Sequence, residues 1–230
     1  MAAGLLLAAL AAVPLPAQAP AAPGAQGTRF VVVLDAAHGG DEAGAALGAG
    51  QNNQQTQTEK TFTLAFAGRL RALLAARGIA VVTTRDNDTA VDAGHRAEVA
   101  NRARAQACVS VHASMSGNGI HLYASSLAPA DGARLAAWKT VQAAFVPRSL
   151  KLAGDLNAAL AHAGLPVSIG RTALVGMDSM ACPAVAVELA PLTAAGKTTA
   201  AAVTDAAYQT RVANALAAAL VQWRAEGQQP

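Results

Sequence analysis

The chain of 230 residues has few aromatic residues, few charged residues and only two cysteines. Charged residues make up 13% of the chain, the net charge is +3, and the lysines and arginines are scattered singly. This excludes the clustered basic surface of a nucleic-acid-binding protein, so we expect no nucleic-acid partner. Cys108 and Cys182 are too isolated to form a metal knuckle. After the N-terminal segment, no apolar run is long enough to form a transmembrane helix.

The N-terminal segment has the features of an export signal. The run "GLLLAALAAV" has the length of a signal-peptide core, and "AQA" at 17–19 is a small-x-small cleavage site. Lysine and arginine are missing before this run, so an alanine-rich leader or an uncleaved anchor is the alternative. We expect residues 1–27 to be a signal peptide with a flexible lead-in, and residues 28–226 to be one folded domain. The mature chain would then lie in the periplasm or extracellular cell wall, without stable membrane insertion after cleavage.

The rest of the chain alternates between apolar runs and amphipathic segments. Alanine is abundant, which favours helices, and "FVVVLD" is typical of a buried parallel strand. Strands are predicted at 30–35, 79–85, 108–114, 119–125, 172–176 and 183–190. Helices are predicted at 58–78, 95–106, 132–145, 149–163 and 204–225. The alternation predicts a single α/β domain with a mostly parallel twisted sheet of about six strands, flanked by helices on both faces.

Four titratable residues lie at the ends of these predicted elements. His38 follows the first strand, His112 ends the third, Glu188 ends the last, and Glu59 begins the first helix. Ligands of open α/β sheets bind at the carboxyl ends of strands, and two histidines with one carboxylate suit catalytic zinc. The alternative is a set of unrelated polar residues, with Glu59 merely complementing the helix dipole. The spacings are too long for a short metal-binding motif, so they do not decide between these interpretations.

The other titratable residues are interpreted as structural. His95 begins a helix, His121 alternates along a strand, and His162 lies near a helix C-terminus, where a cation is favourable. We expect Asp35 to orient the loop that follows it rather than to bind metal, although a contact to a ligand histidine is compatible with its position.

Several motifs, in order along residues 29–224, resemble the zinc-dependent N-acetylmuramoyl-L-alanine amidases of the amidase-3 family. The segment "DAAHGG" is similar to the family's D-P-G-H-G-G, and "TEKTFTLA" to its N-E-K helix start. "TRDNDT" and "HRAEVANRA" follow as in the family, "SVHAS" resembles S-I-H-A-N, and "PAVAVELAP" resembles P-A-V-L-V-E-L-G-F.

The resemblance implies a zinc amidase catalytic domain over residues 28–226. His38, Glu59 and His112 match the ligands of one Zn²⁺, and Glu188 matches the catalytic glutamate. The implied reaction is hydrolysis of the amide between N-acetylmuramic acid and L-alanine in peptidoglycan or muropeptides, and we expect a monomer. A zinc exopeptidase and a catalytically decayed peptidoglycan-binding protein are the alternatives.

The chain departs from the family pattern next to each matched residue. Ala36-Ala37 replaces Pro-Gly, Thr58 and Ser114 replace asparagines, and Ala190-Pro191 replaces Gly-Phe. Some relatives also carry a long helical insertion that covers the site. Residues 126–150 have room for one modest helix and only one acid, Asp131, so we expect an open site here.

The cysteines have matching offsets from two candidate site residues. Cys108 lies four residues before His112, and Cys182 six before Glu188. Both thiols therefore have the parity to share a sheet face with these residues. A disulfide is possible if the two strands are neighbours, and two buried thiols are the alternative.

Overall fold

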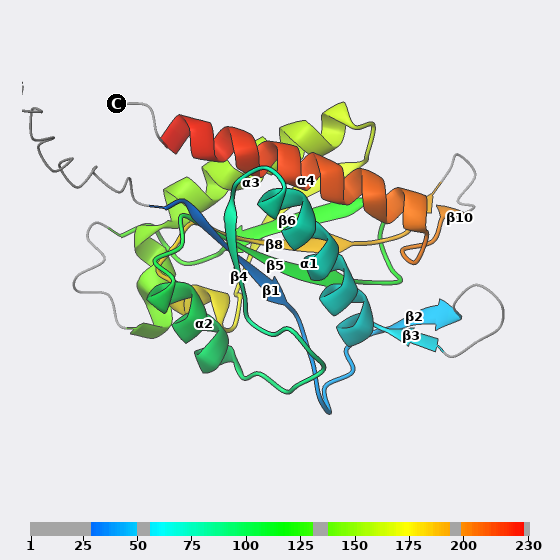
Figure 1. Ribbon diagram of the computed structural model, residues 1–230, viewed down its shortest axis with the longest axis horizontal. Coiled ribbons are helices and arrows are strands. Elements are labelled where there is room, and N and C mark those ends of the chain that lie inside the picture. Colours follow the sequence, from blue (N-terminus) through cyan, green and yellow to red (C-terminus); the bar gives the residue numbers. More distant parts are fainter. Residues whose placement is uncertain (1–28, 50–55, 131–137, 194–198, 228–230) are drawn as a thin grey trace, which may run out of the picture.

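The structure is a computed structural model that describes residues 29–49, 56–130, 138–193 and 199–227. Its centre is a six-stranded sheet with the order β4-β1-β5-β8-β6-β7 (Figure 1). The strands are β1 (Val31–Ala36), β4 (Ala80–Thr83), β5 (Ala107–Ala113), β6 (Ile120–Ser125), β7 (Val167–Thr172) and β8 (Ala184–Leu189). Four of the five pairings are parallel, and only β6 with β8 is antiparallel. The predicted mostly parallel sheet is confirmed.

Helices cover both faces of this sheet, as predicted. One face packs against α1 (Glu59–Ala75), α3 (Val146–His162) and α4 (Ala206–Gly227) through a large apolar core. Figure 1 shows α1 and α4 lying across this face. The other face packs against α2 (Ala93–Arg102) and the short 3-10 helix η3 (Met177–Ser179) through a smaller core. Because side chains alternate along a strand, residues such as Val33 and Ala186 face α2 and η3 while their neighbours face the larger core.

The structure differs from the predicted elements in two segments. The predicted strand at 172–176 is wrong, because the edge strand is β7 and ends at Thr172. After it the chain turns away from the sheet, with Gly176 at a φ of 87° and the Asp178 amide donating to the Leu174 carbonyl. In the predicted helix at 132–145, residues 131–137 lie outside the described residues, and η2 (Trp138–Ala144) is a kinked 3-10 helix.

Two small hairpins were not predicted. β2 (Ala46–Ala49) pairs with β3 (Thr56–Thr58), and β9 (Leu192–Thr193) pairs with β10 (Thr199–Ala201). The first hairpin projects from the sheet just before α1 begins (Figure 1). It therefore lies beside the start of the helix that carries Glu59.

The two cysteines are joined in a disulfide. Cys108 in β5 and Cys182, just before β8, are bonded across a Cα–Cα distance of 6.2 Å. The sequence alone did not decide between a disulfide and two free thiols, because the answer depended on the strand order. In the structure β5 and β8 are neighbours in the sheet, which allows the bond. Among the described residues, no helix has the length and apolar character needed to cross a membrane.

Candidate metal centre

The loop that carries His38 has a constrained backbone. His38 has a φ of 61°, a left-handed conformation that is uncommon for a residue with a Cβ atom and is often found at functional sites. Gly39 and Gly40 also have positive φ, and a Cβ on Gly39 would lie 2.2 Å from the Thr89 carbonyl oxygen. These glycines allow the chain to turn sharply after β1. The turn places His38 beyond the carboxyl end of the strand.

Two buried arginines hold this loop by its carbonyl groups. Arg96 Nη2 donates to the His38 carbonyl at 2.8 Å, and Arg96 Nη1 donates to the Ala36 carbonyl. Arg85 donates to the carbonyls of Ala36 and Ala37, and its Nη2 also donates to the Lys60 carbonyl in α1. Arg85 therefore ties the loop of His38 to the helix that begins with Glu59.

Glu59 lies at the start of α1 with its side chain inside the protein. The residue is only 6% exposed. Its Oε2 accepts a hydrogen bond from the Ala45 amide at 3.0 Å, and its Oε1 accepts one from the Ala113 amide at 3.1 Å. These bonds fix the carboxylate between the first hairpin and the end of β5.

Both candidate histidines reach this carboxylate. His38 Nε2 lies 3.1 Å from Glu59 Oε2, and His112 Nδ1 lies 3.2 Å from Glu59 Oε1. One ligand atom from each of the three residues lies within 4.8 Å of the others. The structure thus brings together the three residues that the sequence singled out as zinc ligands.

The donor set fits a zinc ion. Zinc prefers imidazole nitrogen and carboxylate oxygen, and a tetrahedral site with bonds of about 2.0–2.1 Å separates its ligand atoms by roughly 3.3 Å. The nitrogen–oxygen distances here, 3.1 and 3.2 Å, are close to that separation. His38 and His112 are partly exposed, so the cluster is open on one side to solvent.

The electrostatics of the cluster favour an ionised Glu59. Burial alone would raise the pKa of Glu59, but hydrogen bonds from His112 and from the Ala45 and Ala113 amides, with the nearby His38, lower it to about 2. A carboxylate that remains ionised is ready to bind a cation without first losing a proton.

Glu188 lies beside the cluster but is not part of it. It is the register partner of His112 in β5 and of His121 in β6, so the three share one row across the sheet. Burial raises the pKa of Tyr123, two residues after His121, and the charge of the nearby Glu188 raises it further. Among the described residues, the group with metal-binding geometry contains His38, Glu59 and His112, without Glu188.

His121 was interpreted from the sequence as an ordinary strand residue, and the structure places it opposite Glu188. The reason is the antiparallel direction of β6, which brings the start of that strand to the edge where β5 and β8 end. His121 Nδ1 lies 2.7 Å from Ser168 Oγ, and its ring stacks on Tyr123. His95 and His162 belong neither to the row of His112, Glu188 and His121 nor to the cluster of candidate metal ligands.

A cavity of about 540 Å³ adjoins the cluster on the α2 side of the sheet. His38 and His112 line it together with Asp35, Arg96 and Ser110, and the loop after β7 forms its rim, where Val175 is 90% exposed. Residues 126–130 and 138–150, the described part of the segment expected to leave the site open, do not line this cavity. The expectation for residues 131–137 lies outside the described residues.

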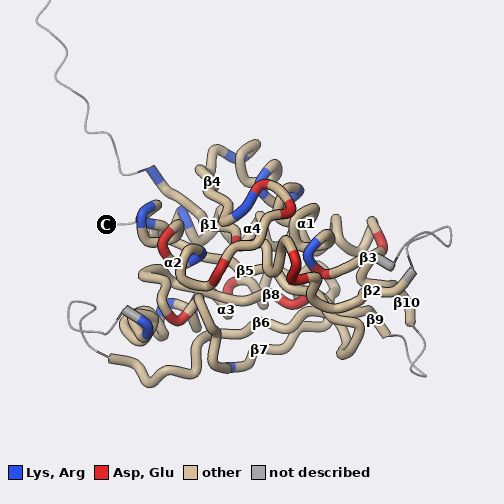
Figure 2. The backbone as a smooth tube through the Cα atoms, turned by 90° about the horizontal axis from the view of Figure 1, so that it is seen from below, with Lys and Arg blue, Asp and Glu red and all other residues tan. Residues whose placement is uncertain are grey.

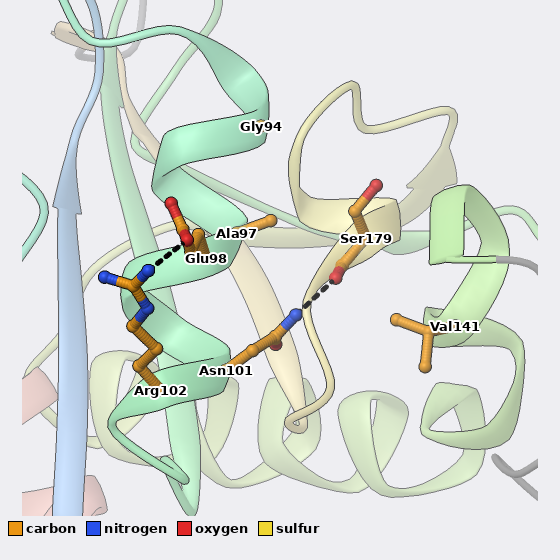
Figure 3. Close-up of a pocket in the computed structure, with 7 residues that line it drawn as sticks. All are labelled: Gly94, Ala97, Glu98, Asn101, Arg102, Val141 and Ser179. Atoms are coloured by element: carbon orange, nitrogen blue, oxygen red, sulfur yellow. Dashed lines mark hydrogen bonds and ion pairs between the residues drawn. The ribbon is translucent and has the colours of Figure 1, made fainter.

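A second hollow, of about 500 Å³, lies between α2 and η3 (Figure 3). Asn101 crosses it, donating to the Ser179 carbonyl and accepting from the Ala181 amide, while Arg102 pairs with Glu98 along α2. The two Asn101 hydrogen bonds attach α2 to η3 and to the segment that follows it. The hollow contains none of the candidate site residues.

The sheet beyond Glu188 is nearly free of charge. Figure 2 shows the tubes of β6 and β7 almost without charged positions, and Arg171 is the only charged residue in these two strands. Arg171 itself donates to the carbonyls of Ser125 and Leu127.

The fold and the cluster together define an α/β domain with a candidate metal centre at the carboxyl ends of its strands. A family model described as N-acetylmuramoyl-L-alanine amidase, Amidase_3, matches residues 32–222. The chain belongs to this family.

Curated relatives match a smaller part of the chain. The N-acetylmuramoyl-L-alanine amidases AmiA of Salmonella typhimurium and Escherichia coli are each 38% identical to it over 87 residues. That segment is 38% of this chain and 28% of each relative.

Solved structures match almost all of the domain. The catalytic domain of the amidase CwlV from Paenibacillus polymyxa has 26% identity and a TM-score of 0.62, covering 85% of this chain and 98% of its own. The amidase from Clostridium difficile 630 has 20% identity and a TM-score of 0.63, covering 88% of this chain and 100% of its own. The second likeness concerns the fold alone.

Sequence reasoning missed the residues that support the cluster. Arg85 and Arg96 lie in the quoted segments "TRDNDT" and "HRAEVANRA" but received no role. Ser110, two residues before His112 in "SVHAS", also received no role. The available signal was the presence of two arginines next to otherwise apolar elements. Buried charges are rare unless they are paired, so these arginines indicated buried partners.

Proposed function

We propose that the chain is a zinc-dependent N-acetylmuramoyl-L-alanine amidase, which hydrolyses the amide between N-acetylmuramic acid and L-alanine in peptidoglycan. The observation that carries this proposal is the convergence of His38, Glu59 and His112 within a domain of the amidase family. These three residues would hold one Zn²⁺. When bound, zinc lowers the pKa of its water towards about 7 and polarises the substrate carbonyl.

The protein residues would supply the proton transfer. Glu188 is the register partner of His112 in the neighbouring strand and lies on the same face of the sheet, and its carboxylate would accept a hydrogen bond from a water at the cluster. It would take a proton from the attacking water and deliver it to the alanine nitrogen as the carbon–nitrogen bond breaks. The products are a free lactyl carboxyl group on the sugar and a stem peptide with a free alanine amine. The reaction needs no serine or cysteine nucleophile.

The domain and its location form part of the same proposal. Residues 28–226 would be the catalytic domain, and residues 1–27 the signal peptide and lead-in. The disulfide between Cys108 and Cys182 supports export, because such bonds persist mainly in oxidising compartments such as the periplasm. We expect the domain to act on the cell wall as a monomer.

Digestion of purified muropeptides by the purified protein, with and without a chelator, tests the proposal. We expect intact stem peptides with a free alanine terminus, loss of this product with chelator, and its return when zinc is added. Release of single amino acids would instead support an exopeptidase. Binding to sacculi without cleavage would support a decayed peptidoglycan-binding protein.

A further inference from the structure

A chain of buried polar contacts leads from the candidate metal centre into the sheet. Ser110 lies two residues before His112 in β5, so both side chains face the α2 side. Ser110 Oγ lies 3.3 Å from His112 Nε2 and donates to Asp35 Oδ2 at 2.6 Å. Asp35 is 5% exposed and Ser110 is 2% exposed, so solvent does not compete for these contacts.

The direction of the hydrogen bonds follows from Asp35. Besides Ser110, Asp35 accepts hydrogen bonds on Oδ1 from Arg96 Nη1 at 2.6 Å and from Thr84 Oγ1 at 2.7 Å. Burial alone would raise the pKa of Asp35, but the Arg96 charge and the bonds from Ser110 and Thr84 lower it below its ordinary value. An ionised carboxylate can only accept, so the hydroxyl hydrogen of Ser110 points to Asp35.

This direction leaves Ser110 a single role towards His112. A serine hydroxyl has one hydrogen and two lone pairs. With its hydrogen directed at Asp35, the oxygen can only accept, and the group that it faces on His112 is Nε2. The other ring nitrogen, Nδ1, faces Glu59 Oε1 at 3.2 Å, on the side where His38 also converges.

We propose that Ser110 is a positioning residue that holds the ring proton of His112 on Nε2 and leaves the Nδ1 lone pair for the metal. The inference rests on the proposed zinc centre. Without a metal, both ring nitrogens of His112 face acceptors, Ser110 Oγ and Glu59 Oε1. With Zn²⁺ held beside Glu59, His112 would offer its Nδ1 lone pair, and its one remaining ring proton would lie on Nε2, where Ser110 accepts it.

The same carboxylate also connects to the second histidine. Arg96 bridges Asp35 and the His38 carbonyl, donating to one through Nη1 and to the other through Nη2. Asp35 thus supports the side chain of His112 through Ser110. It supports the backbone carbonyl of His38 through Arg96. A ligand histidine whose second nitrogen has a fixed acceptor keeps its tautomer and ring orientation.

Zinc affinity tests the role of Ser110 without any measurement of catalysis. In competition with a chromogenic chelator, we expect Ser110→Ala to weaken zinc binding by about 10- to 100-fold, the usual effect of losing such a partner. Ser110→Thr and Ser110→Val form a matched pair with the same bulk, of which only threonine keeps the hydroxyl. We expect Thr to bind zinc close to wild type and Val to bind as weakly as Ala.

A spectroscopic readout separates this role from a general loss of structure. In zinc-loaded protein labelled with ¹⁵N-histidine, we expect a slowly exchanging Nε2 proton signal from His112 that disappears in Ser110→Ala and Ser110→Val. Ser168→Ala is the control, because Ser168 contacts His121 in β6, which lies two strands away from the β5 strand of His112. It should alter the His121 signals and leave those of His112 unchanged.

The inference is overturned if Ser110→Ala and Ser110→Val bind zinc as tightly as wild type, or if the His112 proton lies on Nδ1 in zinc-loaded protein. Should Ala disrupt folding, as circular dichroism would show, the Thr and Val pair decides. If zinc binding depends on Ser110 but the protein does not cleave muropeptides, the proposed reaction is overturned and this inference stands. If the protein cleaves muropeptides and the Ser110 variants bind zinc as tightly as wild type, this inference is overturned and the proposed reaction stands.

Discussion

At the scale of single residues, the site is defined by backbone contacts as much as by side chains. His38 holds a left-handed conformation, and its carbonyl accepts from buried Arg96. Glu59 accepts from two backbone amides, those of Ala45 and Ala113. Such supports hold the three candidate ligands in place before a metal binds, which reduces the ordering that binding requires.

Ligand and proton shuttle have different consequences when they are removed. His112→Ala removes a proposed ligand, so zinc content and activity should fall together. Glu188→Gln keeps the shape of the side chain and should retain zinc, while activity falls by about 10²–10⁴-fold with the loss of the base. Metal analysis after dialysis, beside the muropeptide assay, separates the two. If Glu188→Gln lost zinc as His112→Ala does, Glu188 would be a ligand, and the place of Glu59 in the centre would be in question.

The lowered carboxylate pKa values predict the pH dependence of stability in the metal-free protein. Glu59 has a pKa of about 2 in the folded chain against an ordinary value of 4.5, and the pKa of Asp35 is also lowered from 3.8. In acid, the unfolded chain therefore binds more protons than the folded chain. The free energy of unfolding then decreases as the pH is lowered. The stabilisation from Glu59 is complete above about pH 4.5 and is lost as the pH falls towards about 2.

Urea denaturation between pH 7 and pH 3 measures this effect. We expect wild-type stability to decline below about pH 4.5, with a shallower decline in Glu59→Gln, which lacks the titrating group. A stability that is flat across this range, or an unchanged slope in Glu59→Gln, would contradict the assigned pKa shift.

At the scale of elements, the disulfide joins β5, which carries His112, to the segment that enters β8, which carries Glu188. The bridge closes a loop with a sequence separation of 74. We expect the double variant Cys108→Ala, Cys182→Ala to lose about 2–4 kcal/mol of unfolding free energy, mainly because its unfolded chain is less restricted. Denaturation of oxidised wild type, reduced wild type and the variant checks this. Equal midpoints for all three would show that the bridge contributes nothing to stability.

Most of the fold could be predicted because its signals are local. The apolar run at 30–35 became β1, and the periodic segment at 58–78 became α1, with ends shifted by one to three residues. The hairpin of β2 and β3 could not be predicted, because "ALGA" and "TQT" lack strand-like apolar patterns. The place of β8 between β5 and β6 also escaped prediction, since strand order depends on contacts distant in sequence.

The candidate site divides in the same way. His38, Glu59 and His112 could be singled out because titratable residues at strand and helix ends are conspicuous in an apolar sequence, and a family resemblance identified them further. The supports could not be found in this way. Asp35 meets Arg96 across 61 residues and Ser110 across 75, so these hydrogen bonds exist only once the sheet and α2 have assembled.

At the scale of the whole molecule, the two faces of the sheet have different tasks. Three helices and a large apolar core cover one face, which stabilises the domain. The other face carries a smaller core. Polar residues lie on this face near the carboxyl ends of three strands: Asp35 in β1, His112 in β5 and Glu188 in β8. The parallel direction of these three strands gathers the polar residues at one edge, beside the cavity.

The location of the bound metal tests the account most directly. Crystals of zinc-loaded protein can be measured at wavelengths on both sides of the zinc absorption edge, so that the anomalous difference identifies the element and its position. We predict one zinc peak per chain, bonded to His38 Nε2, the Glu59 carboxylate and His112 Nδ1, with Glu188 beyond bonding distance. A zinc peak elsewhere, none at all, or one that binds Glu188 in place of Glu59 would contradict the account.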